Sequence, residues 1–250
     1  MTDLNLLPGV PTQRVRARLE AADGKELATG KFNSPESSSA LAVDCFGWFL
    51  DRPERLPTLP SIFPLSSWNR VEIEYQARFP WSGGRHPWLD AAAFTSDVLV
   101  GIESKRFEPF RDRKIASLSD AYDRPVWGDN MGRYETVRDA LREGSLTYRH
   151  LDAAQLVKHA FGLVTEAARH QLKPALFYIF LEPTERSGKA IPPSDLKRHR
   201  DEVSDFASRV AGDEVDFAAA SYSDWLKTWP EIDAELHAHA SALKQRYSIL

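Results

Sequence analysis

The most constraining feature of this sequence is a pair of apolar runs separated by only two polar residues. The runs are WLDAAAFT, residues 88–95, and VLVGIESK, residues 98–105, with Ser96-Asp97 between them. Strands joined by a two-residue loop form a tight β-hairpin in which the residues flanking the loop pair with each other. The pattern therefore predicts a hairpin whose register is fixed by its turn.

That register decides which side chains meet. If Thr95 pairs with Val98, counting back along both strands places Asp90 directly opposite Glu103. Their Cβ atoms would then lie about 5 Å apart on one face of the sheet. Lys105, two residues after Glu103, shares that face, because side chains alternate along a strand. A three-residue loop would instead put the two acids on opposite faces.

The remaining elements follow from local patterns. VEIEYQARF, residues 71–79, alternates strictly and predicts a strand whose odd-numbered residues share one face. Ser34-Pro35-Glu36 predicts a helix start with serine as N-cap, proline in the first position and an acid in the first turn. Further predicted elements are a helix over 151–171, a strand over 175–181, a helix over 194–210, a strand over 215–222 and a helical tail over 223–247.

This order of elements predicts an α/β fold with a mixed, twisted sheet flanked by helices. With 250 residues and 42% hydrophobic residues, the chain is long enough to bury a full core in one domain. We expect a single domain over 1–250, with its core at about 34–222 and a C-terminal helical extension over 223–250. Regions 1–33 and 106–150 are expected to be largely irregular.

Composition excludes several functional classes. The net charge of −4 argues against a protein that coats nucleic acid through its overall field. A single cysteine, Cys45, excludes an internal disulfide. No stretch approaches the roughly 18 apolar residues of a membrane span, and the N-terminus does not resemble a signal peptide. We therefore expect a cytoplasmic protein with no membrane partner. Motifs for zinc ribbons, nucleotide binding and serine hydrolases are absent from the sequence.

The two opposed acids need a compensating charge, because like charges directly opposite each other destabilise a sheet. A divalent cation supplies it, since Mg²⁺ binds a few carboxylates together with a backbone carbonyl and waters. Asp90, Glu103 and the Ser104 carbonyl are the predicted ligands of Mg²⁺ or Mn²⁺. Lys105 would assist an attacking water and offset charge in the transition state. Such a site hydrolyses phosphodiester bonds. The alternative, equally open from the spacing, is a solvent-facing polar row on a half-exposed sheet.

The hairpin PWLDAAAFTSDVLVGIESKRFEPF and the segments RFPW, GRHPWLD, RPVWGD and LDAAQLVKHAFGL resemble a restriction-endonuclease-like family of the PD-(D/E)XK nuclease superfamily. The resemblance covers roughly residues 30–225 and implies an αβββαβ core. It also implies Asp90 and Glu103 as metal ligands and Lys105 as the catalytic lysine. One departure is that the acid follows Trp88-Leu89 and not the proline of the family motif. The resemblance supplies no substrate, because members of the superfamily cut DNA or RNA of many forms and some are inactive.

Further residues are candidates for the site. Gln155 and Lys158 share the polar side of the helix after the hairpin, which in this superfamily often contributes a polar residue. Glu36 is a further candidate metal ligand, since the superfamily often has an acid in the first helix. The alternative for Gln155 and Lys158 is that they are solvated surface residues. The alternative for Glu36 is that it only interacts favourably with the helix dipole. Glu72 and Glu74 share a face of the first strand, and at least one is expected to face solvent.

A cationic segment directly follows the E-x-K, and it would contact substrate phosphates or form an ordinary solvated loop. Its cations are Arg106, Arg111, Arg113 and Lys114. Seven tryptophans include candidates for base stacking, although most are expected in the core. The favoured function is a metal-dependent nuclease that acts on nucleic acid, with DNA favoured, and a homodimer is its candidate assembly. The alternative is a catalytically inactive relative that binds nucleic acid or protein.

Overall fold

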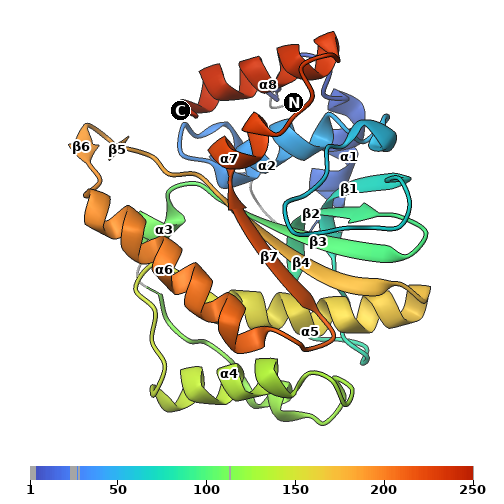
Figure 1. Ribbon diagram of the computed structural model, residues 1–250, viewed down its shortest axis with the longest axis vertical. Coiled ribbons are helices and arrows are strands. Elements are labelled where there is room, and N and C mark those ends of the chain that lie inside the picture. The colour runs from blue at the N-terminus through green and yellow to red at the C-terminus, as the bar shows by residue number, and fades with distance from the viewer. Residues whose placement is uncertain (1–3, 23–26, 28, 113, 250) are drawn as a thin grey trace.

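A five-stranded sheet with helices on both faces forms the centre of the molecule in the computed structural model (Figure 1). The structure describes residues 4–22, 27, 29–112 and 114–249. The strands follow the order β1-β2-β3-β4-β7 across the sheet. Their bounds are β1 Arg70–Gln76, β2 Trp88–Phe94, β3 Val98–Lys105, β4 Lys173–Phe180 and β7 Asp216–Ser221, and a separate small hairpin comprises β5 Glu185–Arg186 and β6 Lys189–Ala190.

The sheet is mixed, as predicted. β1, β2 and β3 pair antiparallel, whereas β3, β4 and β7 pair parallel. Parallel neighbours need crossover connections, and helices supply them between β3 and β4 and between β4 and β7. The predicted α/β class is therefore confirmed, with a restriction-endonuclease-like arrangement of one helix, three antiparallel strands, a long helix and a parallel strand.

Helices cover the two faces of the sheet in two separate hydrophobic cores. One core joins the sheet to α1, α2, α7 and α8, and the other joins it to α4, α5 and α6 (Figure 1). The helix bounds are α1 Thr12–Ala21, α2 Ser38–Gly47, α3 Glu108–Arg111, α4 Gly132–Glu143, α5 Ala153–His170, α6 Pro193–Val210, α7 Tyr222–Lys227 and α8 Ala234–Tyr247, with 3-10 turns at Lys31–Asn33, Pro53–Arg55 and Asp120–Asp123. The predicted irregular regions thus contain α1 and the 12-residue α4.

The first predicted helix starts later than its sequence signal indicated. Ser37 is the N-cap of α2, and its side chain accepts a hydrogen bond from Ala40 N at 3.0 Å. Ser34 instead lies at the end of a 3-10 turn, where its N–H bonds to Lys31 O. Two serines three residues apart both satisfy the capping rule, and the prediction chose the wrong one. Glu36 consequently precedes the helix.

The predicted strict alternation of the first strand is also wrong. Val71 and Ile73 pack in the α2 core, but Ala77 and Phe79 pack in the α5 core. The change of face occurs at Glu74, which has a left-handed backbone with φ of 48°. A residue in this conformation interrupts the regular pleat, so the side chains that follow it point to the other face.

Two glycines let α5 approach the sheet closely. A Cβ on Gly101 of β3 would lie 2.7 Å from Leu163 of α5, and a Cβ on Gly162 would lie 2.8 Å from Ala77. Any side chain at either position would push the helix outward. The residues of α5 that face β3 are therefore held within contact distance of the strand.

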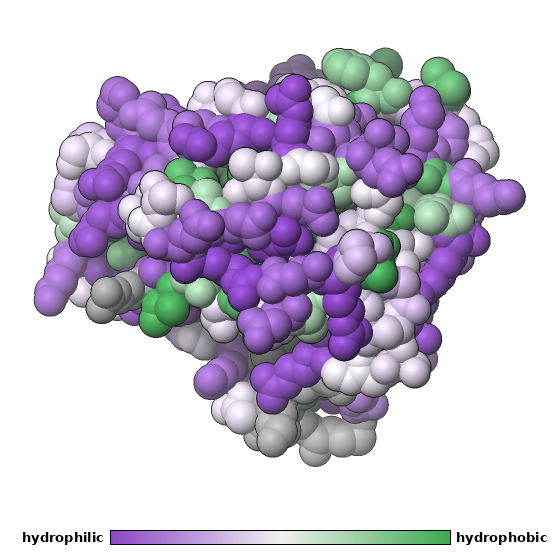
Figure 2. Space-filling model, turned by 90° about the horizontal axis from the view of Figure 1, so that it is seen from below, coloured by the Kyte–Doolittle hydropathy of each residue, from purple (hydrophilic) through white to green (hydrophobic). Residues whose placement is uncertain are grey.

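The face seen from the α4 side is mostly hydrophilic, with hydrophobic side chains scattered in small groups (Figure 2). Such scatter is ordinary for a surface in contact with water. None of the helices in the described residues is both long enough and apolar enough to cross a membrane.

Candidate active site

The hairpin has the predicted two-residue turn. Thr95 N–H donates to Val98 O at 3.0 Å, and the pairing continues to Ala91 opposite Ile102. Asp90 and Glu103 are the next residues of the two strands, one position beyond this last regular pair. Regular pairing of β2 with β3 ends at this point, because the Ser104 N–H donates to Asp90 Oδ2 at 2.7 Å.

Glu103 lies on the α5 face of the sheet and is almost fully buried. Both of its carboxylate oxygens have cationic or polar neighbours. Lys105 Nζ donates to Oε1, and His159 Nε2 of α5 lies 3.2 Å from Oε2. Glu103 and His159 are each only 2% exposed. The close packing of α5 on β3 thus fixes the carboxylate between a lysine and a histidine.

Asp90 faces a small hollow with a volume of about 130 Å³. Ser38 and Ser39 of α2 and Glu74 of β1 line it beside Asp90. Burial raises the pKa of Asp90 well above its usual value, and the nearby Glu103 carboxylate raises it further. The site therefore holds a carboxyl group whose charge is incompletely compensated, as expected where a cation binds.

Lys105 is surrounded by acids. Burial alone would lower the pKa of its ammonium, but the carboxylates of Glu103, Asp90 and Glu108 outweigh burial and raise it. The ammonium side chain is 14% exposed. A lysine held in its charged form at this position acts as a fixed positive charge and not as a base.

Glu108 and His159 belong to the site, although sequence reasoning did not select them. The Glu108 carboxylate accepts from Arg106 N at 2.9 Å and from the Ser38 side chain, and the positive Lys105 helps to lower its pKa against the effect of burial. The signal for Glu108 was its position three residues after Lys105. The signal for His159 was a polar residue one helical turn after Gln155, on the face that packs on the sheet.

The donor set suits a hard divalent cation. The Lys105 carbonyl points toward β4, where it accepts a hydrogen bond from Leu181 N at 2.8 Å. Because backbone groups alternate in direction along a strand, the amide and carbonyl of Ser104 point the other way, toward β2 and Asp90. The oxygens of Asp90, Glu103 and the Ser104 carbonyl are of the kind that Mg²⁺ and Mn²⁺ bind. Among the described residues no three side chains of His, Cys, Asp or Glu converge as a metal site. Mg²⁺ commonly needs only one or two carboxylates, because waters fill its other positions.

Other predicted residues lie around this centre without joining it. The Glu36 carboxylate is bound to Arg186 of β5 at 2.9 Å and lies 3.6 Å from Arg111. This pairing ties the segment just before α2 to the β5–β6 hairpin. It also gives Glu36 a lowered pKa, chiefly through the Arg186 hydrogen bond. Glu72 pairs with Arg18 at 2.8 Å.

The predicted substrate-binding residues are dispersed. Arg106 donates to Pro35 O and lies 4.9 Å from the ring centres of both Phe107 and Tyr247. Arg111 pairs with Asp112 at 2.7 Å, and Lys158 points toward the Tyr122 ring, 6.0 Å away. These contacts leave the phosphate-binding role of Arg106, Arg111 and Lys158 untested.

Two further predicted residues flank the site, and one is not described. Lys114 Nζ donates to Glu108 O at 2.7 Å, and burial lowers the pKa of Lys114. Gln155 lies half-buried in the first turn of α5, one turn before His159. Arg113 lies outside the described residues.

Comparisons with known proteins bear on the whole chain. A protein family described as "Restriction Endonuclease associating with ARP" has a sequence model that matches residues 3–248. No curated protein and no solved structure matches the chain. The match covers both the hairpin and the helices on each side of the sheet.

Proposed function

The chain belongs to the restriction-endonuclease family described as associating with ARP, and from that premise we propose that it is a metal-dependent nuclease of the PD-(D/E)XK type. Its substrate would be nucleic acid, with DNA favoured, and its cofactor Mg²⁺ or Mn²⁺. Asp90, Glu103 and the Ser104 carbonyl would hold the cation.

One observation carries the proposal. At the end of the β2–β3 hairpin, Asp90 accepts a 2.7 Å hydrogen bond from the Ser104 amide, next to Glu103, and Lys105 contacts Glu103 directly. Glu103 is only 2% exposed and also lies 3.2 Å from His159. These contacts and this burial are not those of a solvated polar row.

The residues of the site have separate roles in hydrolysis. A cation held by Asp90, Glu103 and the Ser104 carbonyl would supply a Lewis acid that offsets negative charge on the scissile phosphate. The Lys105 ammonium would orient the attacking water and stabilise charge that develops in the transition state. His159 contacts the Glu103 carboxylate from α5 and would hold it in place. Gln155, in the first turn of the same helix, would hydrogen-bond the substrate or the water.

A second candidate is a catalytically inactive relative that binds nucleic acid or a protein partner. One observation favours it: both Glu103 oxygens already have partners in Lys105 and His159. A cation would have to displace one of these contacts or share the oxygen. The family description also names association with ARP, which we propose as a partner of this chain in either case.

The test is cleavage of labelled DNA and RNA in Mg²⁺ or Mn²⁺ by the wild type and by Lys105→Ala. We expect wild-type cleavage that stops when EDTA is added. Loss of the Lys105 charge should slow cleavage on the order of a hundredfold or more, as for other groups that stabilise a transition state.

Lys197→Ala is the matched control, because Lys197 is 76% exposed and pairs only with the exposed Asp201 of the same helix. Its activity should equal that of the wild type. Binding of nucleic acid without cleavage in either metal would favour the inactive alternative, and equal activity of Lys105→Ala and the wild type would rule out this site.

A further inference from the structure

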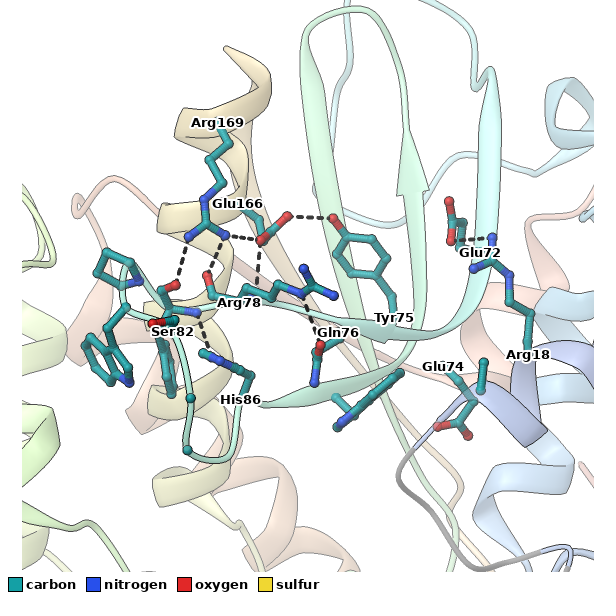
Figure 3. Close-up of a pocket in the computed structure, with 17 residues that line it drawn as sticks. Arg18, Glu72, Glu74, Tyr75, Gln76, Arg78, Ser82, His86, Glu166 and Arg169 are labelled. Carbon is teal, nitrogen blue, oxygen red and sulfur yellow. Dashed lines mark hydrogen bonds and ion pairs between the residues drawn. The ribbon is translucent and has the colours of Figure 1, made fainter.

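A groove with a volume of about 990 Å³ runs beside the edge strand β1 (Figure 3). Its walls are β1, the loop from Arg78 to Trp88, and the end of α5 with Glu166 and Arg169. The Arg169 side chain donates to Glu166 and to the carbonyls of Arg78 and Phe79, which holds the loop against the helix. The groove is therefore a built feature of the fold.

The distribution of tryptophan singles out this groove. Five of the seven tryptophans are buried in the two cores, with at most 6% exposure. The other two, Trp81 and Trp88, are half-buried, and both line the groove. Half-exposed indole rings in a groove are the side chains on which the bases of single-stranded nucleic acid stack.

The charge of the groove differs between its walls. Segment 78–88 contains two arginines and a histidine and no acid. On the opposite side, Glu72 is neutralised by Arg18 at 2.8 Å. Arg124 lies 4.4 Å from the centre of the Trp81 ring and adds positive charge at that end. The aromatic wall is thus also the cationic wall, a combination that suits bases joined to phosphates.

The groove leads to the candidate active site. Glu74 lines both the groove and the small hollow that contains Asp90. Trp88 stands two residues before Asp90 on β2, a separation of about 6.5 Å along a strand. A strand that lies on Trp88 would therefore pass close to Asp90. The left-handed Glu74 also breaks the regular edge of β1, which disfavours its pairing with an extended protein segment.

We infer that the groove binds single-stranded nucleic acid, with bases stacked on Trp81 and Trp88 and phosphates contacted by Arg78, and delivers the strand to Asp90. The inference rests on the proposed nuclease function and narrows its substrate class to single strands or single-stranded ends. Half-exposed indole rings favour single strands, because the bases of a duplex are already stacked on one another and are not free to stack on a side chain.

The test is fluorescence anisotropy of labelled oligothymidylate, oligouridylate and a duplex of equal length, measured with the full chain in EDTA so that no cleavage occurs. We expect at least about tenfold tighter binding of one or both single strands than of the duplex. Trp88→Ala and Trp81→Ala should each weaken single-strand binding about tenfold, whereas Trp88→Phe should retain most of it because phenylalanine still stacks.

Phe63→Ala is the control, because Phe63 is an 83% exposed aromatic residue outside the groove, and its binding should equal that of the wild type. Equal affinity for duplex and single strands, or no effect of the tryptophan substitutions, would overturn the inference. If those substitutions abolish binding of a protein partner but not of oligonucleotides, the groove belongs to the partner. Metal-dependent cleavage that requires Lys105 but not the tryptophans would refute binding of the substrate in the groove and leave the nuclease proposal intact.

Discussion

The β2–β3 hairpin carries an aspartate at each end, and the two are held in opposite ways. Asp97, at the turn, accepts hydrogen bonds from Leu65 N at 3.0 Å, Ser66 Oγ at 3.0 Å and Thr95 Oγ1 at 2.8 Å. These bonds, the Leu65 amide first, lower the pKa of Asp97. The Asp97 carboxylate is therefore satisfied by hydrogen-bond donors, two of which join the turn to the preceding loop.

Asp90, at the other end, has a different environment. It accepts a backbone bond from Ser104 and faces the carboxylates of Glu103 and Glu74. Burial and these acids raise its pKa. A carboxylate that is satisfied by donors stabilises a fold, whereas one that is crowded by other acids costs stability and indicates a functional site. The comparison supports a structural role for Asp97 and agrees with the metal-binding role that we propose for Asp90.

The largest expected effect comes from exchanging each aspartate for asparagine. Asp90→Asn should reduce metal-dependent cleavage on the order of a hundredfold or more. Loss of a residue that only supports a metal ligand already costs about 10- to 100-fold in activity, and loss of a ligand should cost at least as much. Asp97→Asn should leave the rate unchanged. Gel-based cleavage rates in Mn²⁺ measure both variants.

Thermal unfolding of the same two proteins sharpens the contrast. Asp90→Asn should unfold at the wild-type temperature or above it, because it removes charge repulsion with Glu103. If Asp90→Asn instead destabilised the protein while cleavage persisted, Asp90 would be a structural residue like Asp97, and the assignment of roles would fail.

A smaller effect is expected at His159, which contacts Glu103 from α5. Its Nδ1 atom is buried and has no hydrogen-bond partner within the described residues, so the ring costs stability as well as positioning the carboxylate. His159→Leu removes both the unpaired atom and the contact. We expect the free energy of unfolding to stay level or rise, while Mn²⁺ affinity measured by calorimetry falls about 10- to 100-fold.

His159→Gln provides the matched control, because its amide keeps a donor toward Glu103 Oε2. Most of the Mn²⁺ affinity should return with this variant. If leucine and glutamine gave the same affinity as histidine, the ring would have no part in placing Glu103, and only the two strands would define the site.

The sequence sufficed for the features that depend on local spacing. The predicted two-residue turn is present, and the register that follows from it runs from Phe94 opposite Leu99 to Ala91 opposite Ile102, one position short of Asp90 and Glu103. α5 was predicted because its apolar positions recur with helical period, and the structure adds Asp152 as its N-cap. Both depend on residues close together in the chain, where turn and capping chemistry act directly.

Features that depend on packing between distant residues escaped prediction. β1 changes face at Glu74, which has a left-handed backbone and accepts a 3.3 Å hydrogen bond from Ser39 of α2, and the alternating pattern did not reveal either feature. Glu36 was predicted at the metal but pairs with Arg186, which is 150 positions away in the chain. His159 enters the site only because glycines bring α5 close to β3.

The smallest expected effect concerns stability at the turn. Because the pKa of Asp97 is lowered on folding, its ionised form stabilises the native state above the ordinary aspartate pKa of 3.8, and this contribution is lost as pH falls through the native pKa. Asp97→Asn should therefore lower the free energy of unfolding by about 1 kcal/mol at neutral pH, since one acceptor oxygen becomes a donor that faces other donors. Urea unfolding at neutral pH and below pH 3 measures this, and the difference from the wild type should shrink in acid. A difference that stayed constant with pH would show that the hydrogen-bond geometry matters and the charge does not, which would remove the electrostatic contrast between the two ends of the hairpin.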